Sequence, residues 1–408
     1  MEKWEREFIR DLARRRLEIA NTPAMQKLAG EWAAHNDLRG SRPMIHFEMG
    51  TVGDAGFHYQ CKCVSGDARN IEWMIGESMQ NHVMVGDDRV VSNEFYVGYN
   101  SWMQLFGLSP NRTGTDGVGF HINAVIDNLD TLDMIKPSPM GFDEESFNRN
   151  IEYYGDILGD ILDVKGGMGS IGICPTNNLV QLMTMENMFV SMYDNPDNFH
   201  AMMERLTCDY ITYITELERR GMLLPCYRNN WLGQGSFAYS DQMKSEAGDI
   251  KLGDIWGYMD SQETVGISPE MFKEFFYPYY KRISEKFGRL SYGCCEPVHS
   301  FWESSLSHFD NLRKISISKW CDERYMGDML RNSKVIYHRK PSPLFVGGTD
   351  YNLDEDGFRE HIQNTMKAAR GCKLEFAFRD VYTLNGNLGK PRRAVEIIRE
   401  ETENTWRQ

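Results

Sequence analysis

Eight short apolar segments, separated by longer helical ones, constrain the fold of this chain more than any other feature. Each segment is rich in β-branched or aromatic residues and is bounded by glycine, proline or polar residues, as buried strands are. They span residues 43–49, 90–98, 169–174, 254–260, 289–295, 312–318, 335–341 and 374–381. Two further segments, 118–126 and 223–230, are predicted to be strands or hairpins outside this set.

Amphipathic helices are predicted between the strand segments. The segment 268–288 begins with Ser268 and Pro269, residue types favoured at a helix N-cap and at the first helical position, and it ends at a glycine. Helices are also predicted over 178–194, 195–221 and 354–371. Strands that alternate with helices pair in parallel through right-handed crossovers. Eight such units predict a TIM barrel, a closed (β/α)₈ fold, and a doubly wound open sheet is the alternative.

The chain is predicted to have two parts. Residues 1–40 have apolar positions at three- and four-residue spacing, which predicts an N-terminal helical extension. No proline-rich or serine-rich linker divides the remainder, so residues 41–408 are predicted to form one TIM-barrel catalytic domain. Barrels that carry extra helices routinely reach this length.

Charge and cysteine content exclude several classes of protein. The 408 residues include 45 basic and 59 acidic side chains, a net charge of −14, and no basic block, so neither nucleic acid nor a membrane is an expected partner. No run of about 18 apolar residues exists, and the N-terminus lacks the apolar core of a secretory signal. The nine cysteines are irregularly spaced, which argues against a disulfide framework and favours a reducing, cytoplasmic location. The oligomeric state is left open, and a homodimer is compatible with the sequence.

Residues with catalytic or ligating chemistry stand near the ends of the predicted strands, where the active site of a TIM barrel lies. Thiolates, carboxylates and imidazoles that converge on one face suit a zinc site or an acid–base site. The structural alternative is that a strand cysteine is a small buried hydrophobe and a histidine a satisfied core residue. Alternation points only one of Cys294 and Cys295 inward, and the sequence does not say which.

Three groups of candidate residues follow from these positions. The candidate catalytic residues are Glu48, His46, Asp260 and Glu263. The candidate substrate-binding residues are Tyr292, Gln262, Trp320 and Lys340. The candidate metal ligands are Cys295, Cys294, Glu296, His338 and Asp380. Glu296 directly follows a buried strand, and a carboxylate in that position needs a partner.

Two stretches of the chain resemble the uroporphyrinogen decarboxylase superfamily. The first is "GSIGICPTNNLVQLMTMENMFVSMYDNPDNFHAMMERLTCDYITY" (169–213), and the second, more specific one is "DIWGYMDSQETVGISPEMFKEFFYPYYKRI" (254–283). The resemblance covers about residues 40 to 400 and implies a TIM barrel with one of two chemistries. One is cofactor-free decarboxylation of uroporphyrinogen, and the other is zinc-dependent methyl transfer that involves a separate corrinoid protein.

The details of the resemblance favour methyl transfer. The decarboxylases carry an Arg-Gln-Ala-Gly-Arg stretch after the first strand, where this chain reads "HFEMGTVGDAG" (46–56) without arginine. The related methyltransferases carry His-x-Cys-Gly at the fifth strand and Gly-Cys at the eighth. This chain has Gly293-Cys294-Cys295-Glu296 and Arg379-Asp380-Val381, so one thiol position, Cys295, is kept and the last cysteine is replaced by Asp380.

The resemblance therefore implies a demethylating methyltransferase. It would pass a methyl group from a small donor to the cobalt of cobalamin on a separate corrinoid protein, with zinc or a carboxylic acid activating the leaving group. A methoxylated aromatic is the favoured donor, and methylamine or methanol are the others. The alternative is a uroporphyrinogen decarboxylase-like lyase. The segment "DAGFH" (54–58) lacks the D-x-H-x-x-G pattern of a cobalamin-binding module, so the corrinoid is expected on the partner.

Overall fold

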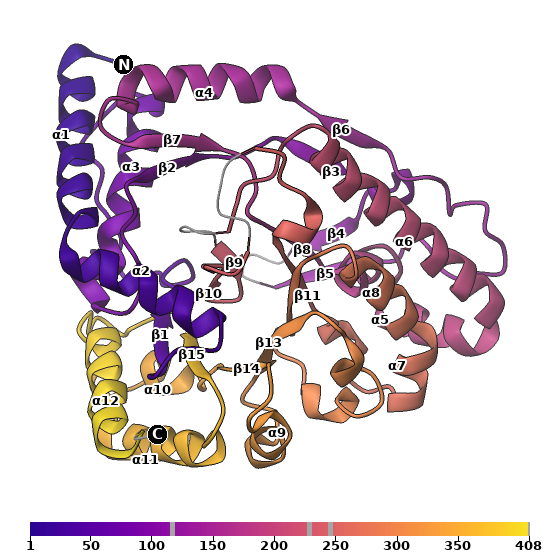
Figure 1. Ribbon diagram of the computed structural model, residues 1–408. Helices are drawn as coiled ribbons and strands as arrows, with labels where there is room; N and C mark the ends of the chain where they lie inside the picture. The colour runs from indigo at the N-terminus through magenta and orange to yellow at the C-terminus, as the bar shows by residue number, and fades with distance from the viewer. Residues whose placement is uncertain (115–118, 227–230, 244–247, 407–408) are drawn as a thin grey trace.

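The fold is built on one curled parallel sheet of seven strands (Figure 1). The computed structural model describes residues 1–114, 119–226, 231–243 and 248–406. In spatial order the strands are β1 (Met44–Phe47), β15 (Leu374–Phe378), β14 (Ile336–Arg339), β13 (Leu312–Ile317), β12 (Arg289–Tyr292), β11 (Trp256–Met259) and β8 (Ser170–Ile173). Every pairing in this sheet is parallel, so all carboxyl ends lie at one edge.

All eight predicted strand segments contain a strand, but the predicted closure of the barrel is not observed. The segment 90–98 contains β2 (Glu94–Val97), which pairs in parallel with β7 (Asp163–Gly166) in a separate two-stranded sheet. Within the described residues no strand ladder joins β1 to β8. The architecture is a curled, TIM-like half-barrel of seven strands. The prediction of a closed eight-stranded (β/α)₈ barrel is therefore wrong in its closure.

A glycine separates the β2–β7 pair from the main sheet. Gly167 lies between β7 and β8 with φ at +135°, a backbone conformation that L side chains rarely adopt. A Cβ atom at this position would lie 2.9 Å from the carbonyl oxygen of Met222. The Gly-rich sequence therefore breaks what would otherwise be one strand, and β7 and β8 belong to different sheets.

A short hairpin lies between the two edge strands of the sheet. It consists of β9 (Trp231–Gly233) and β10 (Ser236–Phe237), at the centre of Figure 1. The His46 ring of β1 is hydrogen-bonded to the Gly235 carbonyl oxygen at 3.1 Å. The Ser170 hydroxyl of β8 donates to the Trp231 carbonyl oxygen at 2.5 Å. The hairpin thus bridges the opening that strand pairing leaves.

Twelve α-helices are described, and they surround the strands (Figure 1). They are α1 (Lys3–Ala20), α2 (Pro23–Asn36), α3 (Gly66–Gln80), α4 (Glu144–Leu158), α5 (Pro175–Asp194), α6 (Pro196–Arg219), α7 (Pro269–Phe275), α8 (Tyr277–Ser284), α9 (Glu323–Leu330), α10 (Leu344–Gly347), α11 (Glu355–Ala368) and α12 (Lys390–Thr405). The predicted helix 268–288 is two helices, because Phe276 departs from helical geometry and Pro278 lacks the N–H that would continue the hydrogen-bond ladder. No described helix is long and apolar enough to cross a membrane.

Two antiparallel hairpin-like pairs extend from the β2 region. They are β3 (Ser101–Met103) with β6 (Met140–Phe142), and β4 (Asn111–Gly114) with β5 (Phe120–Asn123). The predicted segment 118–126 thus contains β5. In the predicted segment 223–230, Leu223 forms an isolated bridge with Met168, and residues 227–230 lie outside the described residues.

Candidate functional site

The carboxyl ends of the strands bring a set of polar side chains to one edge of the sheet. The residues that directly follow the strands are Glu48, Cys174, Asp260, Gly293, Ser318, Lys340 and Arg379. Hydrogen bonds and ion pairs connect several of them across neighbouring strands.

Two basic side chains meet at one amide oxygen. Arg379 forms an ion pair with Glu48, and both Arg379 and Lys340 donate to the side-chain oxygen of Gln234, which lies in the turn of the β9–β10 hairpin. The Lys340 ammonium also donates to the Cys294 carbonyl oxygen at 2.8 Å. Burial lowers the pKa of Lys340. The hairpin therefore fixes the positions of two cations above the sheet.

The two adjacent thiols both lie at this edge. The Cys294 and Cys295 sulfur atoms are 3.6 Å apart, and the Cys295 sulfur lies 3.9 Å from Oδ2 of Asp380. The pKa of Cys295 is lowered to about 7, because the Cys294 thiol donates a hydrogen bond to it and the charge of Lys340 favours the thiolate. The Cys294 thiol has a raised pKa, since it shares that hydrogen bond and is largely buried. Cys295 is therefore the more nucleophilic of the pair at neutral pH.

Cys295 is expected to react with iodoacetamide faster than Cys61 at pH 7, because burial raises the pKa of Cys61 and keeps it a thiol. The rate of Cys295 alkylation should fall as the pH is lowered through about 7, where its thiolate becomes protonated. Peptide mass spectrometry after short labelling measures both rates. Equal labelling of Cys61 and Cys295 at pH 7, or a Cys295 rate independent of pH between 5.5 and 8.5, would contradict this assignment.

Asp260 is a buried carboxyl group with one unused oxygen. The Tyr258 hydroxyl donates to Oδ2, while Oδ1 accepts no hydrogen bond from the described residues. The side chain of Cys174 lies beside it. Burial raises the pKa of Asp260, and the nearby charge of Glu263 raises it further. A raised pKa keeps this carboxyl group protonated to a higher pH than an ordinary aspartate, which suits it to donate a proton to a bound molecule.

Glu296 accepts two backbone hydrogen bonds that hold the loop after β12 in place. Its Oε1 accepts from the Ser261 backbone N–H at 3.0 Å, and its Oε2 accepts from the Cys294 backbone N–H at 2.8 Å. Burial raises the pKa of Glu296 to about 7, with a further contribution from the charge of Asp260. The hydrogen-bond partners of this buried carboxylate are therefore two backbone N–H groups, which follow the neighbouring strands β11 and β12.

Glu263 connects the strand-end site to the start of α5. Its carboxylate accepts from the Thr176 hydroxyl at 2.8 Å and from the Asn177 side-chain amide at 2.9 Å. Gln262 is half-buried in the same short turn, η4 (Gln262–Thr264). The first turn of α5 is therefore tied to the loop after β11.

The two candidate histidines lie deeper in the structure than the strand-end residues. Nδ1 of His46 is hydrogen-bonded to the Gly235 carbonyl oxygen of the β9–β10 hairpin. Nδ1 of His338 lies 3.6 Å from Oε1 of the buried Glu375. Burial lowers the pKa of His46 well below its usual value and the pKa of His338 to about 3, so both rings are neutral. No recorded contact joins either ring to the thiols or to Asp260 within the described chain.

Two candidate substrate-binding residues lie apart from the thiols and cations. Tyr292 is fully buried, with its ring near Tyr280 and Phe309 and its hydroxyl 2.5 Å from the Ser261 hydroxyl. Trp320 is 64% exposed and lies in the loop after β13. Tyr292 therefore packs and positions the β11–β12 ends, while Trp320 belongs to the outer rim.

The candidate zinc ligands do not form a coordination shell. A tetrahedral site needs three or four donors that point at one position. Among the described residues no group of three or more His, Cys, Asp or Glu side chains is arranged to hold a metal ion. Lys340 donates to the Cys294 carbonyl, and Nη1 of Arg379 lies 3.9 Å from the Cys294 sulfur, so two fixed positive charges oppose a cation there. The residues as placed do not fit zinc, and bound zinc stays a prediction.

Three residues of this site were not among the sequence candidates. Arg379 and Cys174 directly follow β15 and β8, so they too lie at the strand ends, where the active site of a TIM barrel is expected. Gln234 lies between Gly233 and Gly235 in the turn of the β9–β10 hairpin. Gly233, Gln234 and Gly235 all have positive φ. The sequence Gly-Gln-Gly marks a tight turn, but nothing local indicates that the turn reaches the strand ends.

Comparisons with known proteins support the fold. No protein-family profile matches the sequence, and no curated protein matches it by sequence. Twenty-three chains of solved structures match its fold. One of them, titled "methyltransferase from Methanosarcina mazei", matches with a TM-score of 0.53 and 11% sequence identity, and the match covers 90% of this chain and 98% of that one. At this identity the likeness concerns the fold alone.

Proposed function

We propose that this chain is a methyltransferase that moves a methyl group from a small donor to the cobalt of a separate corrinoid protein. A methoxylated aromatic is the first choice of donor, and methylamine and methanol are the others. The likeness in fold to a protein titled methyltransferase supports the reaction class. The observation that carries the proposal is Asp260, a buried carboxyl group with a raised pKa and a free oxygen at the strand-end edge.

The chemistry needs an acid at the leaving atom. In a methyl ether the carbon–oxygen bond breaks, and the methyl carbon takes up the electron pair that reduced cobalt on the partner provides. The oxygen leaves with the electrons of the broken bond and takes the proton of Asp260, so that an alcohol or phenol is released. A positioned general acid of this kind contributes about 10²- to 10⁴-fold to a rate. Glu296 and Glu263 hold the loops on either side of Asp260.

A partner protein must reach the strand-end edge for this reaction. Large apolar side chains are exposed in the segments that directly follow four of the strands: Val265, Trp320, Leu344 at the start of α10, Tyr351 and Tyr382. Isolated exposed apolar residues are ordinary on protein surfaces. Their occurrence in segments at the same end of the sheet as the acids and thiols supports docking of a protein over the site.

Replacing both Trp320 and Tyr382 with alanine is expected to raise the KM for the corrinoid protein by roughly tenfold or more, because large aromatic anchors dominate such interfaces. The affinity for the methyl donor and the melting temperature should stay unchanged, since both side chains are exposed. Steady-state kinetics with varied partner concentration give the measurement. Trp4→Ala, which removes an exposed aromatic ring from α1, is the control. The same KM for the double variant and the control would contradict docking at this rim.

A carboxy-lyase is the second candidate, because Lys340 and Arg379 are cations able to hold a substrate carboxylate. However, the charge of Arg379 is already balanced by Glu48. One remaining buried lysine at the centre of the site suits a substrate with several carboxylates poorly. Methyl transfer is therefore placed first.

Anaerobic incubation with a cob(I)alamin-loaded carrier tests the proposal. Methoxyarenes, methylamines and methanol are supplied one at a time, and absorbance is followed. The expected result is loss of the cob(I)alamin spectrum and growth of the methylcobalamin spectrum with at least one donor, only when the protein is present. No spectral change with any donor, together with release of carbon dioxide from a polycarboxylated porphyrinogen, would favour the lyase instead.

A further inference from the structure

A cavity of about 920 Å³ lies at the amino ends of β14 and β15, at the edge of the sheet opposite to the strand-end site. Asn332 and Ser333 line this amino-edge cavity from the loop before β14, and Lys373 lines it directly before β15. Thr405 and Trp406 line it from the end of α12, the helix at the yellow end of the chain in Figure 1. Its volume is within the range of small-molecule sites.

Hydrogen bonds between separate chain segments hold the walls of the amino-edge cavity together. The Asn332 backbone N–H donates to the Gly371 carbonyl oxygen at 3.1 Å, which joins the loops before β14 and β15. The Lys373 ammonium donates to the Gly40 carbonyl oxygen at 2.7 Å, which joins the start of β15 to the segment after α2. Leu38 of that segment also lines the cavity. The cavity is therefore built into the fold by three connected segments.

The lining of the cavity includes an apolar wall and several neutral polar groups. Met366 and Cys372 are buried, and Trp406 is half-buried and packs against the main core. An indole ring in such a position can stack against an aromatic ring of a ligand. Neutral amides and hydroxyls can bind the polar edge of a nucleobase, and this cavity has four of them: Asn332, Ser333, Gln363 and Thr405.

Three cations line the cavity, and no carboxylate is among its lining residues. They are Lys367, Arg370 and Lys373. No recorded ion pair joins any of them to an acid within the described part of the chain, and Asp328 of the adjoining helix α9 pairs with Arg331 instead. A cation at the carboxyl end of α11 is favoured by the helix dipole alone, but Lys373 lies outside that helix. The three charges together favour an anion with more than one negative charge.

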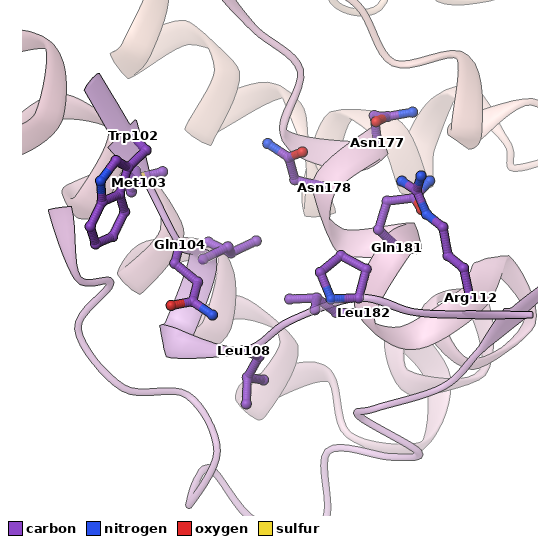
Figure 2. A pocket seen from close by; sticks show the side chains of 11 residues that line it. Trp102, Met103, Gln104, Leu108, Arg112, Asn177, Asn178, Gln181 and Leu182 are labelled. Atoms are coloured by element: carbon purple, nitrogen blue, oxygen red, sulfur yellow. The ribbon is translucent and has the colours of Figure 1, made fainter. Parts of the chain in front are cut away.

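The cavity shown in Figure 2 differs in this respect. It has a volume of about 560 Å³ and lies between the β3–β4 region and the first turns of α5. Arg112 is the one cation among its described lining residues, and Nε of Arg112 donates to the Gln181 side-chain oxygen at 2.8 Å. A doubly charged phosphate group is therefore better matched at the amino edge.

We propose that the amino-edge cavity binds a mononucleotide. Its phosphate pairs with Lys367, Arg370 and Lys373, because lysine and arginine side chains bind phosphate oxygens through charge-assisted hydrogen bonds. Its base stacks on Trp406, and the neutral amides and hydroxyls of the lining bind the polar edge of the base. Binding of a nucleotide here does not depend on methyl transfer at the opposite edge of the sheet.

Calorimetric titration with AMP, adenosine and inorganic phosphate, without any methyl donor or corrinoid, tests the proposal. The unaltered protein is expected to bind AMP at least tenfold more tightly than adenosine, because only AMP carries the group that pairs with the three cations. It should also bind AMP at least tenfold more tightly than phosphate, because phosphate has no ring to stack on Trp406.

Two double variants locate the phosphate. Lys367→Met/Arg370→Met removes two exposed cations of the cavity and should weaken AMP binding by tenfold or more, with adenosine binding unchanged. Lys286→Met/Arg15→Met makes the same change in charge at exposed positions elsewhere and should leave AMP binding unchanged. Arg112→Met, which removes the cation of the cavity in Figure 2, should also leave it unchanged.

Three results would overturn the proposal. One is that the unaltered protein does not bind AMP, or binds it no more tightly than adenosine, and this result needs no variant to be folded. Another is a loss of AMP binding as large in Lys286→Met/Arg15→Met as in Lys367→Met/Arg370→Met. The third is a loss of AMP binding in Arg112→Met alone, which would assign the nucleotide to the cavity beside α5.

Discussion

Asp260→Asn is expected to lower the rate of methyl transfer from a methyl ether by about 10²- to 10⁴-fold, the usual contribution of a positioned general acid. Asparagine keeps the size of the side chain, and its carbonyl oxygen can still accept the hydrogen bond from Tyr258. It has no acidic proton for the leaving oxygen. Because the polar contacts around it are preserved, the melting temperature should change little.

The pH dependence separates the loss of the acid from general damage to the site. Burial raises the pKa of Asp260, so the protonated, active form predominates at low pH and is lost as the pH rises through that raised value. The wild-type rate should therefore fall on the alkaline side, and the residual Asp260→Asn rate should show no such fall. Asp310→Asn, which changes an exposed acid, is the control. An Asp260→Asn rate above one third of the wild type at every pH would rule out Asp260 as the acid.

Lys314→Met is expected to destabilise the protein by about 3–5 kcal/mol, because it leaves a buried charge without its partner. The Lys314 ammonium lies 2.8 Å from the Glu375 carboxylate, and both side chains are almost completely buried inside the curled sheet. Glu375 also contacts His35 and the Ser236 hydroxyl of the hairpin. Removing the lysine therefore disturbs α2, the hairpin and two central strands together.

Equilibrium unfolding in urea measures the effect. The double variant Lys314→Met/Glu375→Met removes both charges and should be more stable than the single variant, since no unpaired carboxylate remains. Lys367→Met removes an exposed lysine from α11 and should stay within about 0.5 kcal/mol of the wild type. A single-variant loss below about 1 kcal/mol would show that Glu375 is neutral or finds water when the lysine is absent.

The strands of this protein are predictable because their signal is local. Each of the eight apolar segments contains a strand, since burial on both faces of a parallel strand requires a continuous apolar run. Closure is a property of pairing between distant segments. The displacement of the β2–β7 pair at Gly167 and the bridging hairpin around Gln234 depend on contacts that no local pattern records.

The expectation that functional residues follow the strands gives the edge of the sheet at which a side chain lies, but not how deeply that side chain is buried. Asp260, Cys295 and Lys340 lie at that edge, as positions one to three residues beyond a strand must. His46 and His338 lie within their strands, so their side chains occupy a lower layer and contact the hairpin and Glu375 instead. Alternation along a strand gives the face of a residue, and the layer follows only once the register is known.

Transfer of an isotopically labelled methyl group tests the central claim most directly. The protein is incubated anaerobically with a cob(I)alamin-loaded carrier and 4-methoxybenzoate labelled with ¹³C in the methyl group, and the corrinoid and the aromatic product are analysed by mass spectrometry. The account predicts ¹³C-methylcobalamin and 4-hydroxybenzoate in equal amounts, with both strongly reduced in Asp260→Asn. Unlabelled corrinoid beside unchanged 4-methoxybenzoate, or equal yields from Asp260→Asn and the wild type, would contradict it.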